Sequence, residues 1–478
     1  MKLDLAPRKE DHDGGGGNPT DGMPTPRRYL AIAAISLGTI LTVIDGQIAG
    51  VALPTIARDL HVDGSAAVLV VTVYQLVLVM TLLPFSALGD RIGLKTLYQG
   101  GQAVFAIATL LCFFAKSLPF LLIVRAVQSL GAAAALSVMS ALIRSIYPAK
   151  HLGRGLGFNS VMVSVSAALA PTAGGMILAV APWPWVFAIG VPFAILSLLL
   201  GRFGLPEIKG RDVGYDGLGA FYCVVTFGLT IFGLEAGVHG GSPVVAGAIL
   251  IAGLVFAVVF VRYELKQPHP IMPVDLLRLP VLALSSAGAF CAFVAATLLT
   301  LSLPFRLQHG FGFTPSEVGA MIAPWPLTTM IVAPTAGTLS DKVPAGLLGG
   351  IGMAVATIAL LFLALLPAHP DYWDVAWRMA LCGSGFGLFL SPNARLIVGS
   401  APRHRAASAG GLISTVRLSG QTIGATGVAA LLAFSFGEGP IPPLIACLLA
   451  VIAGVLSMAR LNPALRRPAA SELGHGPA

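Results

Sequence analysis

The chain has 478 residues, of which 56% are apolar and only 10% carry a charge. A soluble domain has roughly a quarter of its residues as Asp, Glu, Lys and Arg, so this composition excludes a water-soluble fold of such length. The net charge of +8 comes from Lys and Arg in short clusters between apolar blocks, with no basic face beside aromatic residues, which argues against nucleic-acid binding.

The apolar blocks have the length, about 20 residues, with which a helix crosses the hydrocarbon of a bilayer. They predict an all-α integral membrane protein with fourteen transmembrane helices. The first block is too long for the core of a signal peptide and has no small-residue cleavage site after it, so we expect it to remain as the first helix. The blocks lie at about 29–53, 66–88, 97–115, 119–143, 156–181, 185–201, 217–237, 243–263, 283–304, 316–339, 346–367, 374–399, 408–436 and 440–459.

The positive charges of the loops test this count. If successive loops alternate between the two sides of the membrane, the outer side receives only Arg58, Lys116, Arg306 and Arg378, and the inner side receives the other loop cations. Short cytoplasmic loops carry the excess of Lys and Arg. Because one missed or extra span would reverse this bias from that point onward, its persistence supports fourteen spans with both termini in the cytoplasm.

Two loops repeat one pattern. Residues 86–95 read Ser-Ala-Leu-Gly-Asp-Arg-Ile-Gly-Leu-Lys and residues 337–342 read Gly-Thr-Leu-Ser-Asp-Lys, so a small residue, Leu, Asp and a cation recur at one spacing. Internal repeats are typical of transporter folds. The expected organisation is a disordered tail over 1–28, a six-helix bundle over 29–201, a linker over 202–282 with two extra transmembrane helices, a second six-helix bundle over 283–459 and a cytoplasmic tail over 460–478.

Four segments resemble motifs of the major facilitator superfamily, specifically of its fourteen-helix drug:proton antiporters. Residues 44–54, Ile-Asp-Gly-Gln-Ile-Ala-Gly-Val-Ala-Leu-Pro, resemble Leu-Asp-x-Thr-Ile-Val-Asn-Val-Ala-Leu-Pro in the first span. Residues 86–95 resemble the cytoplasmic motif Gly-x-Leu-Ala-Asp-Arg-x-Gly-Arg-Lys. Residues 125–131, Arg-Ala-Val-Gln-Ser-Leu-Gly, are similar to Arg-x-x-Gln-Gly-x-Gly, and residues 166–175, Ser-Ala-Ala-Leu-Ala-Pro-Thr-Ala-Gly-Gly, to the antiporter signature Gly-x-x-x-Gly-Pro-x-x-Gly-Gly.

The resemblance implies a function as well as a fold. We expect a secondary transporter in the inner (plasma) membrane that exports small lipophilic, cationic compounds such as drugs and antiseptics in exchange for protons. Such a protein is driven by the proton gradient without a cofactor, works as a monomer, and has the solute, protons and the lipid bilayer as its partners. The alternative is a metabolite or lipid-like solute transporter of the same fold.

Asp45 is the strongest candidate for proton coupling. It lies well inside the first span, where an ionised carboxylate at the helix centre costs roughly 2.5–3.5 kcal/mol, so it must face a cavity, find a partner or be protonated. A cation and a proton would then compete for one carboxylate; a structural hydrogen bond between helices is the alternative. Arg125 of the fourth span is the second buried charge, and Asp45 or backbone carbonyls are its expected partners. The resemblance implies a part in proton coupling for Arg125, and pairing that only holds the fold is the alternative.

The repeated loops are expected to form a conformational gate. Asp90 at a helix-to-loop junction is predicted to pair with a cation near the fourth span, for which Arg144 is a guess, and to face a helix amino end. Positive charge that only sets the topology is the alternative, and it explains Arg91 and Lys95 better than it explains Asp90. The gate candidates are Asp90, Arg91, Gly93, Lys95 and Asp341.

Small residues on the fifth span form the third candidate feature. Pro171, Gly174 and Gly175 predict a kink and a flat surface on which another helix packs closely. This surface is either a hinge for the rocking of the bundles or ordinary membrane packing.

Several further polar and aromatic residues are candidates for lining a cavity. They are Tyr74, Gln75, Trp325, Arg417 and Glu235. An aromatic side chain in a membrane span more often faces lipid or core, and Glu235, near the outer end of its span, is expected as an exposed loop charge with a cation-attracting vestibule as the lesser alternative. We assign the intramembrane cations Arg395 and Arg417 to pairing or packing.

The sequence also argues against an enzyme. All nine histidines fall in tails or loops, and neither His-Glu-x-x-His nor Gly-x-x-x-x-Gly-Lys-Ser/Thr occurs, which disfavours a membrane metalloprotease and an ATP-driven pump. The five cysteines all lie in apolar blocks without Cys-x-x-Cys spacing, so we expect structural thiols and no metal site.

Overall fold

The computed structural model describes residues 22–148, 152–208, 210, 215–238, 242–267, 270–401 and 406–462. Within these ranges the side chains of residues 152–157, 160, 161, 164, 168 and 406–408 are not described. The predicted tails therefore lie largely outside the described residues.

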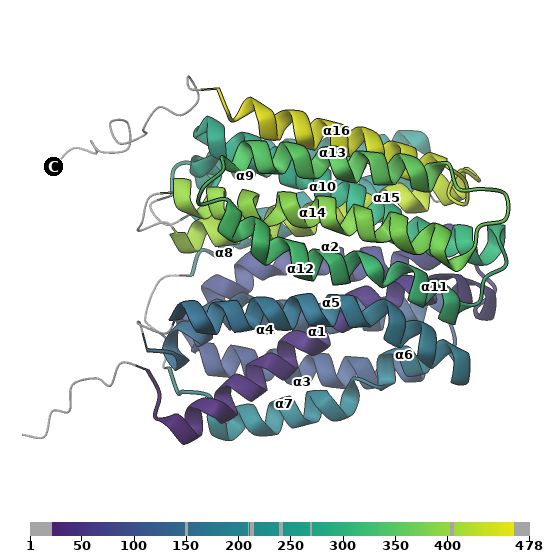
Figure 1. Cartoon of the computed structure of the whole chain (residues 1–478). Helices are drawn as coiled ribbons and strands as arrows, with labels where there is room; N and C mark the ends of the chain where they lie inside the picture. Colours follow the sequence, from purple (N-terminus) through teal and green to yellow (C-terminus); the bar gives the residue numbers. More distant parts are fainter. Residues whose placement is uncertain are drawn as a thin grey trace, which may run out of the picture.

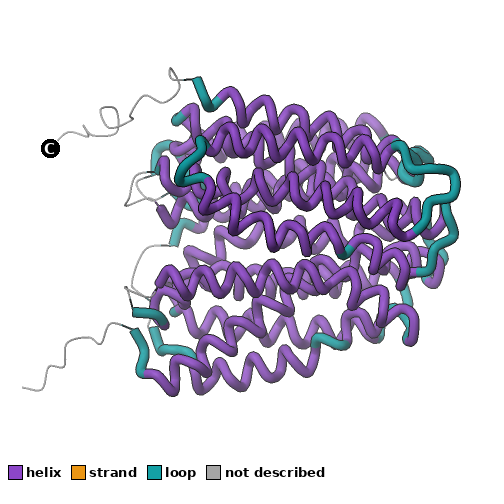
Figure 2. Tube along the Cα trace, in the orientation of Figure 1, coloured by secondary structure: helices purple, strands orange, loops and turns teal. Residues whose placement is uncertain are grey.

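Every regular element in the described ranges is a helix (Figure 2). In the first half these are α1 (Thr25–Asp59), α2 (Gly64–Ile92), α3 (Leu94–Phe113), α4 (Leu118–Ile146), α5 (Leu152–Val180), α6 (Pro184–Ala188) and α7 (Val191–Gly204). The linker holds α8 (Gly217–Val238), α9 (Pro243–Glu264) and the short η2 (Val274–Arg278). The second half has α10 (Pro280–Phe305), η3 (Arg306–Gly310), α11 (Pro315–Ile322), α12 (Pro324–Leu339), α13 (Ala345–Ala364), α14 (Tyr372–Ser400), α15 (Ala406–Ala433) and α16 (Ile441–Ala459).

These helices confirm the all-α membrane fold. Eleven spans in the described part are long and apolar enough to cross a membrane, with α6 and α7 forming one of them and α11 and α12 another. Together with α5, α14 and α15 they account for the fourteen predicted spans. The two breaks fall just before Pro192 and Pro324, because proline lacks the amide hydrogen and clashes with the preceding turn. Three helix ends differ from the expected segments by a few residues: α1 begins at Thr25, inside the expected tail, and α7 ends at Gly204 and α10 begins at Pro280, both inside the expected linker.

The helices lie side by side in two bundles (Figure 1). The first contains α1 to α7 and the second α10 to α16, while α8 and α9 pack on each other and α8 also packs on α2 and α15, one helix from each bundle. The described chain begins and ends at the same end of the assembly, here named the inner end (Figure 1). The opposite end is the outer end.

The two bundles repeat one helix crossing at the level of single residues. A Cβ added to Gly101 of α3 would lie 2.7 Å from the carbonyl oxygen of Gly131 on α4, and one added to Gly352 of α13 would lie 2.6 Å from that of Gly385 on α14. In each crossing a Cβ added to the second glycine would lie 2.5 Å from the backbone nitrogen of the residue four positions after the first glycine. Small residues allow such close approach. Thus α3–α4 and α13–α14 are structural equivalents, which supports the internal repeat.

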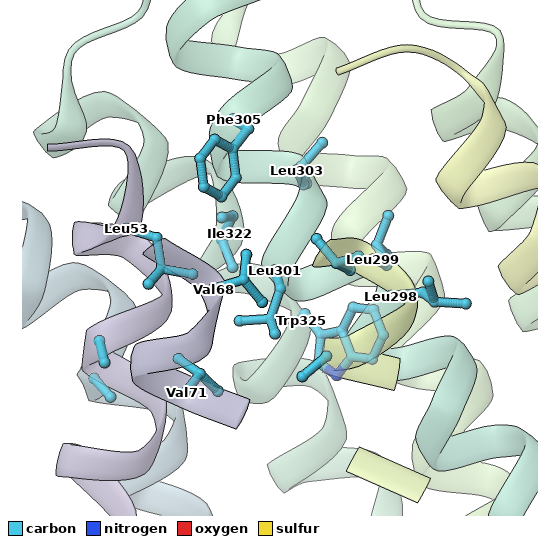
Figure 3. Packing of buried hydrophobic residues seen from close by; sticks show 14 of the residues in the cluster. Leu53, Val68, Val71, Leu298, Leu299, Leu301, Leu303, Phe305, Ile322 and Trp325 are labelled. Carbon is cyan, nitrogen blue, oxygen red and sulfur yellow. The ribbon is translucent and has the colours of Figure 1, made fainter. Parts of the chain in front are cut away.

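The main hydrophobic core joins the bundles at the outer end. One cluster contains Leu53 of α1 and Val68 of α2 together with Leu301 and Phe305 of α10 and Ile322 of α11 (Figure 3). At the inner end, by contrast, two separate clusters each belong to one bundle, apart from residues of the adjoining segments. The outer end is therefore closed by contacts between the bundles.

Candidate functional site

The centre of the first bundle contains a buried charge pair. A guanidinium nitrogen of Arg125 (Nη1), on α4, lies 2.6 Å from carboxylate oxygen Oδ2 of Asp45, on α1. Arg125 is fully buried and Asp45 is only 7% exposed. The expected pairing of these two residues is thus present, and burial makes each charge depend on the other, because an unpaired ion at this depth is costly.

Gln128 completes the pair. Its amide nitrogen donates to the other carboxylate oxygen of Asp45 at 2.9 Å, and its amide oxygen accepts from Nη1 of Arg125 at 2.6 Å. The same amide nitrogen lies 2.8 Å from the hydroxyl of Thr109 on α3. Gln128 was noted only as a motif residue; its spacing of three from Arg125, which puts both on one face of α4, is the signal that points to this role.

Helices α2 and α6 supply the remaining surroundings of Arg125, with Val70 and Tyr74 on α2 and Phe187 on α6. The Nε of Arg125 donates to the carbonyl oxygen of Val70 at 3.3 Å, and its guanidinium carbon lies 4.2 Å from the ring centre of Tyr74 and 5.1 Å from that of Phe187. Aromatic faces attract a guanidinium, most strongly where water is excluded. The site therefore ties four helices of one bundle, α1 to α4, to a single pair of opposite charges.

The second bundle has no counterpart of this pair at the equivalent positions. The repeated glycine crossing places Arg125 in register with Met379 and Gln128 with Cys382. Both of these side chains are fully buried and neither can carry or balance a charge as Arg125 and Gln128 do. The buried pair is thus a property of the first bundle.

The predicted gate residues are only partly brought together. Asp90 and Arg91 are exposed near the inner end of α2, and within the described residues no hydrogen bond or ion pair involves Asp90, so the guessed pair with the exposed Arg144 is not formed in this structure. Lys95 instead lies 3.4 Å from the exposed Glu207 beside a groove of about 420 Å³. Gly93 has φ +100° and an added Cβ would lie 2.7 Å from the carbonyl oxygen of Ile208, so only glycine fits.

In the second bundle the equivalent aspartate is paired. Asp341 forms an ion pair with Arg395 of α14, which also donates to the carbonyl oxygen of Gly337 at 3.1 Å and to the hydroxyl of Ser340 at 2.9 Å. Arg395 thus forms a pair, as expected, but its side chain lies exposed at the inner end of the helix, whereas it was expected as an intramembrane cation. Both side chains are more than half exposed, so the pair adds little stability by itself.

The small residues of α5 form a contact between the bundles. A Cβ added to Gly175 would lie 2.7 Å from the carbonyl oxygen of Pro315, and one added to Gly319 of α11 would lie 2.5 Å from that of Pro171. Gly174 faces Ile48 of α1 at 2.8 Å in the same construction. The flat surface predicted on the fifth span therefore lies where α5 crosses α11 in the outer half.

Two of the cavity candidates belong to the protein interior. Glu235 of α8 is buried and accepts a hydrogen bond of 2.6 Å from Thr426 of α15. The expectation of an exposed loop charge was therefore wrong, because this side of α8 packs against the second bundle. Trp325 is 9% exposed and its ring stacks on Phe386 with 4.9 Å between centres.

The other cavity candidates lie near the boundary between the bundles. Tyr74 covers Arg125, and neither its hydroxyl nor the amide oxygen of Gln75 has a hydrogen-bond partner within the described part of the chain. Arg417 is partly buried in the middle of α15 and likewise makes no hydrogen bond or ion pair there.

One buried cation had been assigned only to the tail. Arg460, just after α16, is 3% exposed and donates to the hydroxyl of Ser285 at 2.8 Å, to the side-chain oxygen of Asn393 and to Ser457. The sequence places Arg460 at a helix end beside the tail, and only the packing of α10, α14 and α16 around it shows that it is enclosed.

No metal centre is found in the described ranges: they contain no group of three or more His, Cys, Asp or Glu residues placed to hold an ion. All five cysteines are free thiols.

The sequence profile of the Major Facilitator Superfamily matches residues 35–425, which is most of the chain. The chain belongs to this superfamily. It is therefore a multi-pass membrane transporter that carries a small-molecule solute, and not an enzyme.

Named relatives agree with this membership. The "Uncharacterized transporter YebQ" of Escherichia coli K12 is 44% identical over 446 residues, covering 92% of this chain and 97% of the relative. The "Riboflavin transporter RibZ" of Clostridioides difficile is 27% identical, covering 82% and 85%, and the "Multidrug resistance protein Stp" of Mycobacterium tuberculosis CDC 1551 is 29% identical, covering 83% and 74%.

Solved superfamily structures share the fold. A bacterial homologue of the human lysosomal transporter Spinster, in an inward-facing and unoccupied conformation, aligns with a TM-score of 0.67 at 19% identity, covering 91% of this chain and 97% of that one. At this identity the likeness concerns the fold alone.

Proposed function

We propose that this superfamily member is a proton-coupled exporter of small lipophilic compounds, working by alternating access, with Asp45 as the group that takes up and releases the proton. The observation that carries the proposal is the buried Asp45–Arg125 pair at 2.6 Å inside membrane-spanning helices. An intramembrane ionisable pair of this kind is typical of a proton relay or substrate pathway.

Protonation of Asp45 has a defined consequence in this geometry. It removes the negative charge that attracts Arg125, while the guanidinium keeps the amide oxygen of Gln128 at 2.6 Å and the carbonyl oxygen of Val70 at 3.3 Å. The link between α1 and α4 is thereby weakened, while Arg125 keeps two hydrogen-bond acceptors. Helix α1 also contacts the second bundle, because Gln308 donates to the carbonyl oxygen of Val51 at 3.4 Å. A weaker link between α1 and α4 therefore changes the contacts that close the outer end.

Asp45 is not proposed as the binding group for a cationic solute. Both of its carboxylate oxygens already accept hydrogen bonds, from Arg125 and Gln128. A cation bound at this carboxylate would lie against the positive charge of Arg125. The proton coupling and the binding of the solute are therefore assigned to different residues.

The names of the relatives support two candidate substrate types. The drug-resistance name of Stp supports efflux of foreign compounds, and the name of RibZ supports the alternative, a metabolite transporter of the same fold. We place the chain in the plasma membrane with its inner end in the cytoplasm, because most loop cations lie at that end. A single chain contains both bundles and the pair, so we propose that the monomer transports.

Proton flux in proteoliposomes tests the coupling. Purified wild type, Asp45→Asn and the control Asp59→Asn, an exposed carboxylate at the outer end of the same helix, are reconstituted with a pH dye in the lumen. We expect substrate-dependent proton movement in wild type and in Asp59→Asn, and solute exchange without proton movement in Asp45→Asn. Proton-driven accumulation that persists in Asp45→Asn would exclude Asp45 as the coupling group.

A further inference from the structure

Arg417, a cation in the middle of a membrane-spanning helix, has no partner among the described residues. Of the described residues none accepts a hydrogen bond from it and none forms an ion pair with it, and its side chain is partly buried. The other buried arginines differ: Arg125 pairs with Asp45, Arg306 donates to the carbonyl oxygens of Leu363 and Ala364 at the end of α13, and Arg460 is enclosed by neutral acceptors. An unpaired charge at membrane depth normally faces a water-filled cavity and marks a solute path.

The contacts of α15 show which way Arg417 faces. Gly420 and Gly424 pack against Phe293 and Thr297 of α10. Leu418 shares a hydrophobic cluster with residues of α2, and an added Cβ on Gly411 would lie 3.7 Å from Leu83 of α2. These contacts place α10 and α2 on two sides of α15.

Helix α8 marks the outside of this arrangement. Thr426 of α15 donates to Glu235 of α8, and Cys223 of α8 lies 3.8 Å from the carbonyl oxygen of Met80 on α2, so α8 covers the seam between α2 and α15. Successive residues of a helix are rotated by about 100° around its axis. Arg417 therefore lies on the arc of the α15 surface between the contacts with α10 and with α2, on the side away from α8. This arc faces the space between the bundles.

The same arc of α15 is polar along its length. Four partly buried residues are spaced by four, three and four positions, which aligns them on one face of the helix. We name this face the stripe; it consists of Gly410, Ser414, Arg417 and Gln421. A Cβ added to Gly410 would meet no atom within 4 Å, so there is open space beside the inner part of this stripe. Gly46 of α1, next to Asp45, is open in the same way.

The stripe is connected to the charge pair of the first bundle. Leu418, the neighbour of Arg417, shares its cluster with Tyr74, whose ring covers Arg125. The Tyr74 hydroxyl has no partner within the described part of the chain. A ligand on the stripe would therefore lie beside the residue that covers the proton-coupling pair.

We propose that Arg417, with Ser414 and Gln421, binds an anionic group of the transported solute: a carboxylate, sulfonate or phosphate. A guanidinium is suited to such groups because it donates several hydrogen bonds in a fixed plane. The apolar walls of the seam, Leu83, Leu418 and the ring of Tyr74, fit an aromatic or aliphatic body. The solute is thus an amphipathic organic anion or zwitterion. This inference rests on the proposed function in that the solute crosses between the bundles.

Charge-selective thiol labelling tests the electrostatic part directly. Ser414→Cys is reacted in detergent with the anionic reagent 2-sulfonatoethyl methanethiosulfonate and the cationic reagent 2-trimethylammonioethyl methanethiosulfonate, and the parent chain gives the background of the native cysteines. We expect the anionic-to-cationic rate ratio to fall by about tenfold in Arg417→Gln and to persist in Arg417→Lys, since a nearby unit charge attracts one reagent and repels the other. Ser419→Cys, on the α8 side of the helix, is the control whose ratio does not depend on Arg417.

Competition with two dyes tests the substrate class. Fluorescein and rhodamine 6G share a xanthene ring system and differ in charge, so fluorescein is expected to slow the labelling of Cys at position 414 severalfold while rhodamine 6G does not. No reaction at this position, a ratio unchanged in Arg417→Gln, or equal protection by both dyes would overturn the inference. The assay needs no proton gradient, so Asp45→Asn is expected to retain the charge selectivity even where proton coupling is lost, which separates a failure of this inference from a failure of the proposed function.

Discussion

The hydroxyl of Thr426 donates a hydrogen bond of 2.6 Å to the carboxylate of Glu235, and thereby ties the second bundle to the inserted helix α8. Glu235 lies within a membrane-spanning helix and is buried, so the contact holds a polar group that lipid would not solvate. Because α8 also contacts α2, the pair of inserted helices is attached to both bundles and is not a passive addition at the lipid surface.

The first prediction concerns this attachment. Thr426→Val is expected to lower the free energy of unfolding, with a coupling to Glu235→Gln of about 0.6 kcal/mol, the average for hydrogen bonds between membrane helices. A double-mutant cycle of unfolding in detergent mixtures measures it. Thr422→Val is the matched control, because the Thr422 hydroxyl bonds only the Leu418 carbonyl oxygen of its own helix. Equal effects at both positions with no coupling would contradict the attachment.

The second prediction concerns the charge pair. Arg125→Ala leaves the carboxylate of Asp45 buried without its counter-ion, and is expected to lower the free energy of unfolding by about 3–5 kcal/mol. The double variant Asp45→Asn, Arg125→Gln removes both charges and is expected to be less destabilised than Arg125→Ala alone. Unfolding titrations of the purified variants compare them. A double variant that is as unstable as the sum of the two single changes would mean that the two charges do not interact.

The third prediction uses adjacent glycines of α3. An added Cβ on Gly101 meets the carbonyl oxygen of Gly131 at 2.7 Å, whereas one on Gly100 meets nothing within 4 Å. Gly101→Ala is therefore expected to destabilise by about 1–3 kcal/mol through overpacking, and Gly100→Ala to stabilise by up to about 1 kcal/mol through helix propensity. Thermal unfolding followed by fluorescence distinguishes them. The same sign for both would refute the tight crossing.

The fourth prediction concerns closure at the outer end. Gly319→Ala forces a Cβ against the carbonyl oxygen of Pro171, so α5 and α11 must separate and the outer end opens more often. The reporter is Gln308→Cys, at the position where Gln308 donates to the carbonyl oxygen of Val51. In whole cells we expect a membrane-impermeant maleimide to label this cysteine severalfold faster when Gly319→Ala is added than without it. Gly247→Ala, in open space on α9, is the control and leaves the labelling rate unchanged. An equal rate in Gly319→Ala would show that this crossing does not hold the end closed.

Much of the fold could be predicted because lipid imposes simple rules on a sequence. Blocks of apolar residues give the number and length of the spans, and the cost of an unpaired intramembrane charge predicts a partner for Arg125, with Asp45 as one of the two alternatives. What hydropathy does not give is the rotation of each helix. In a span that is apolar on both its lipid and its core faces, no polar side distinguishes them, as α8 shows.

The wrong and missing predictions follow from this. The burial of Glu235 depends on which side of α8 packs against α15, and the enclosure of Arg460 depends on three helices meeting at one end. Asp90 is a different case, since a gate contact forms only in some states of a transport cycle. Its role, like those of the other candidate site residues, stays a prediction.

The repeated glycine crossing gives the two bundles the same helix arrangement, but where the first bundle has the buried Arg125 and Gln128 the second has Met379 and Cys382. In the proposed cycle, protonation of Asp45 changes the first bundle from neutral at its centre to carrying one positive charge, while the second keeps the same charge at these positions. Moving one elementary charge across a membrane potential of 100 mV changes the free energy by about 2.3 kcal/mol. The transmembrane voltage would then exert a force on the first bundle that it does not exert on the equivalent positions of the second. A transporter built from two similar halves would in this way respond to voltage through one of its halves.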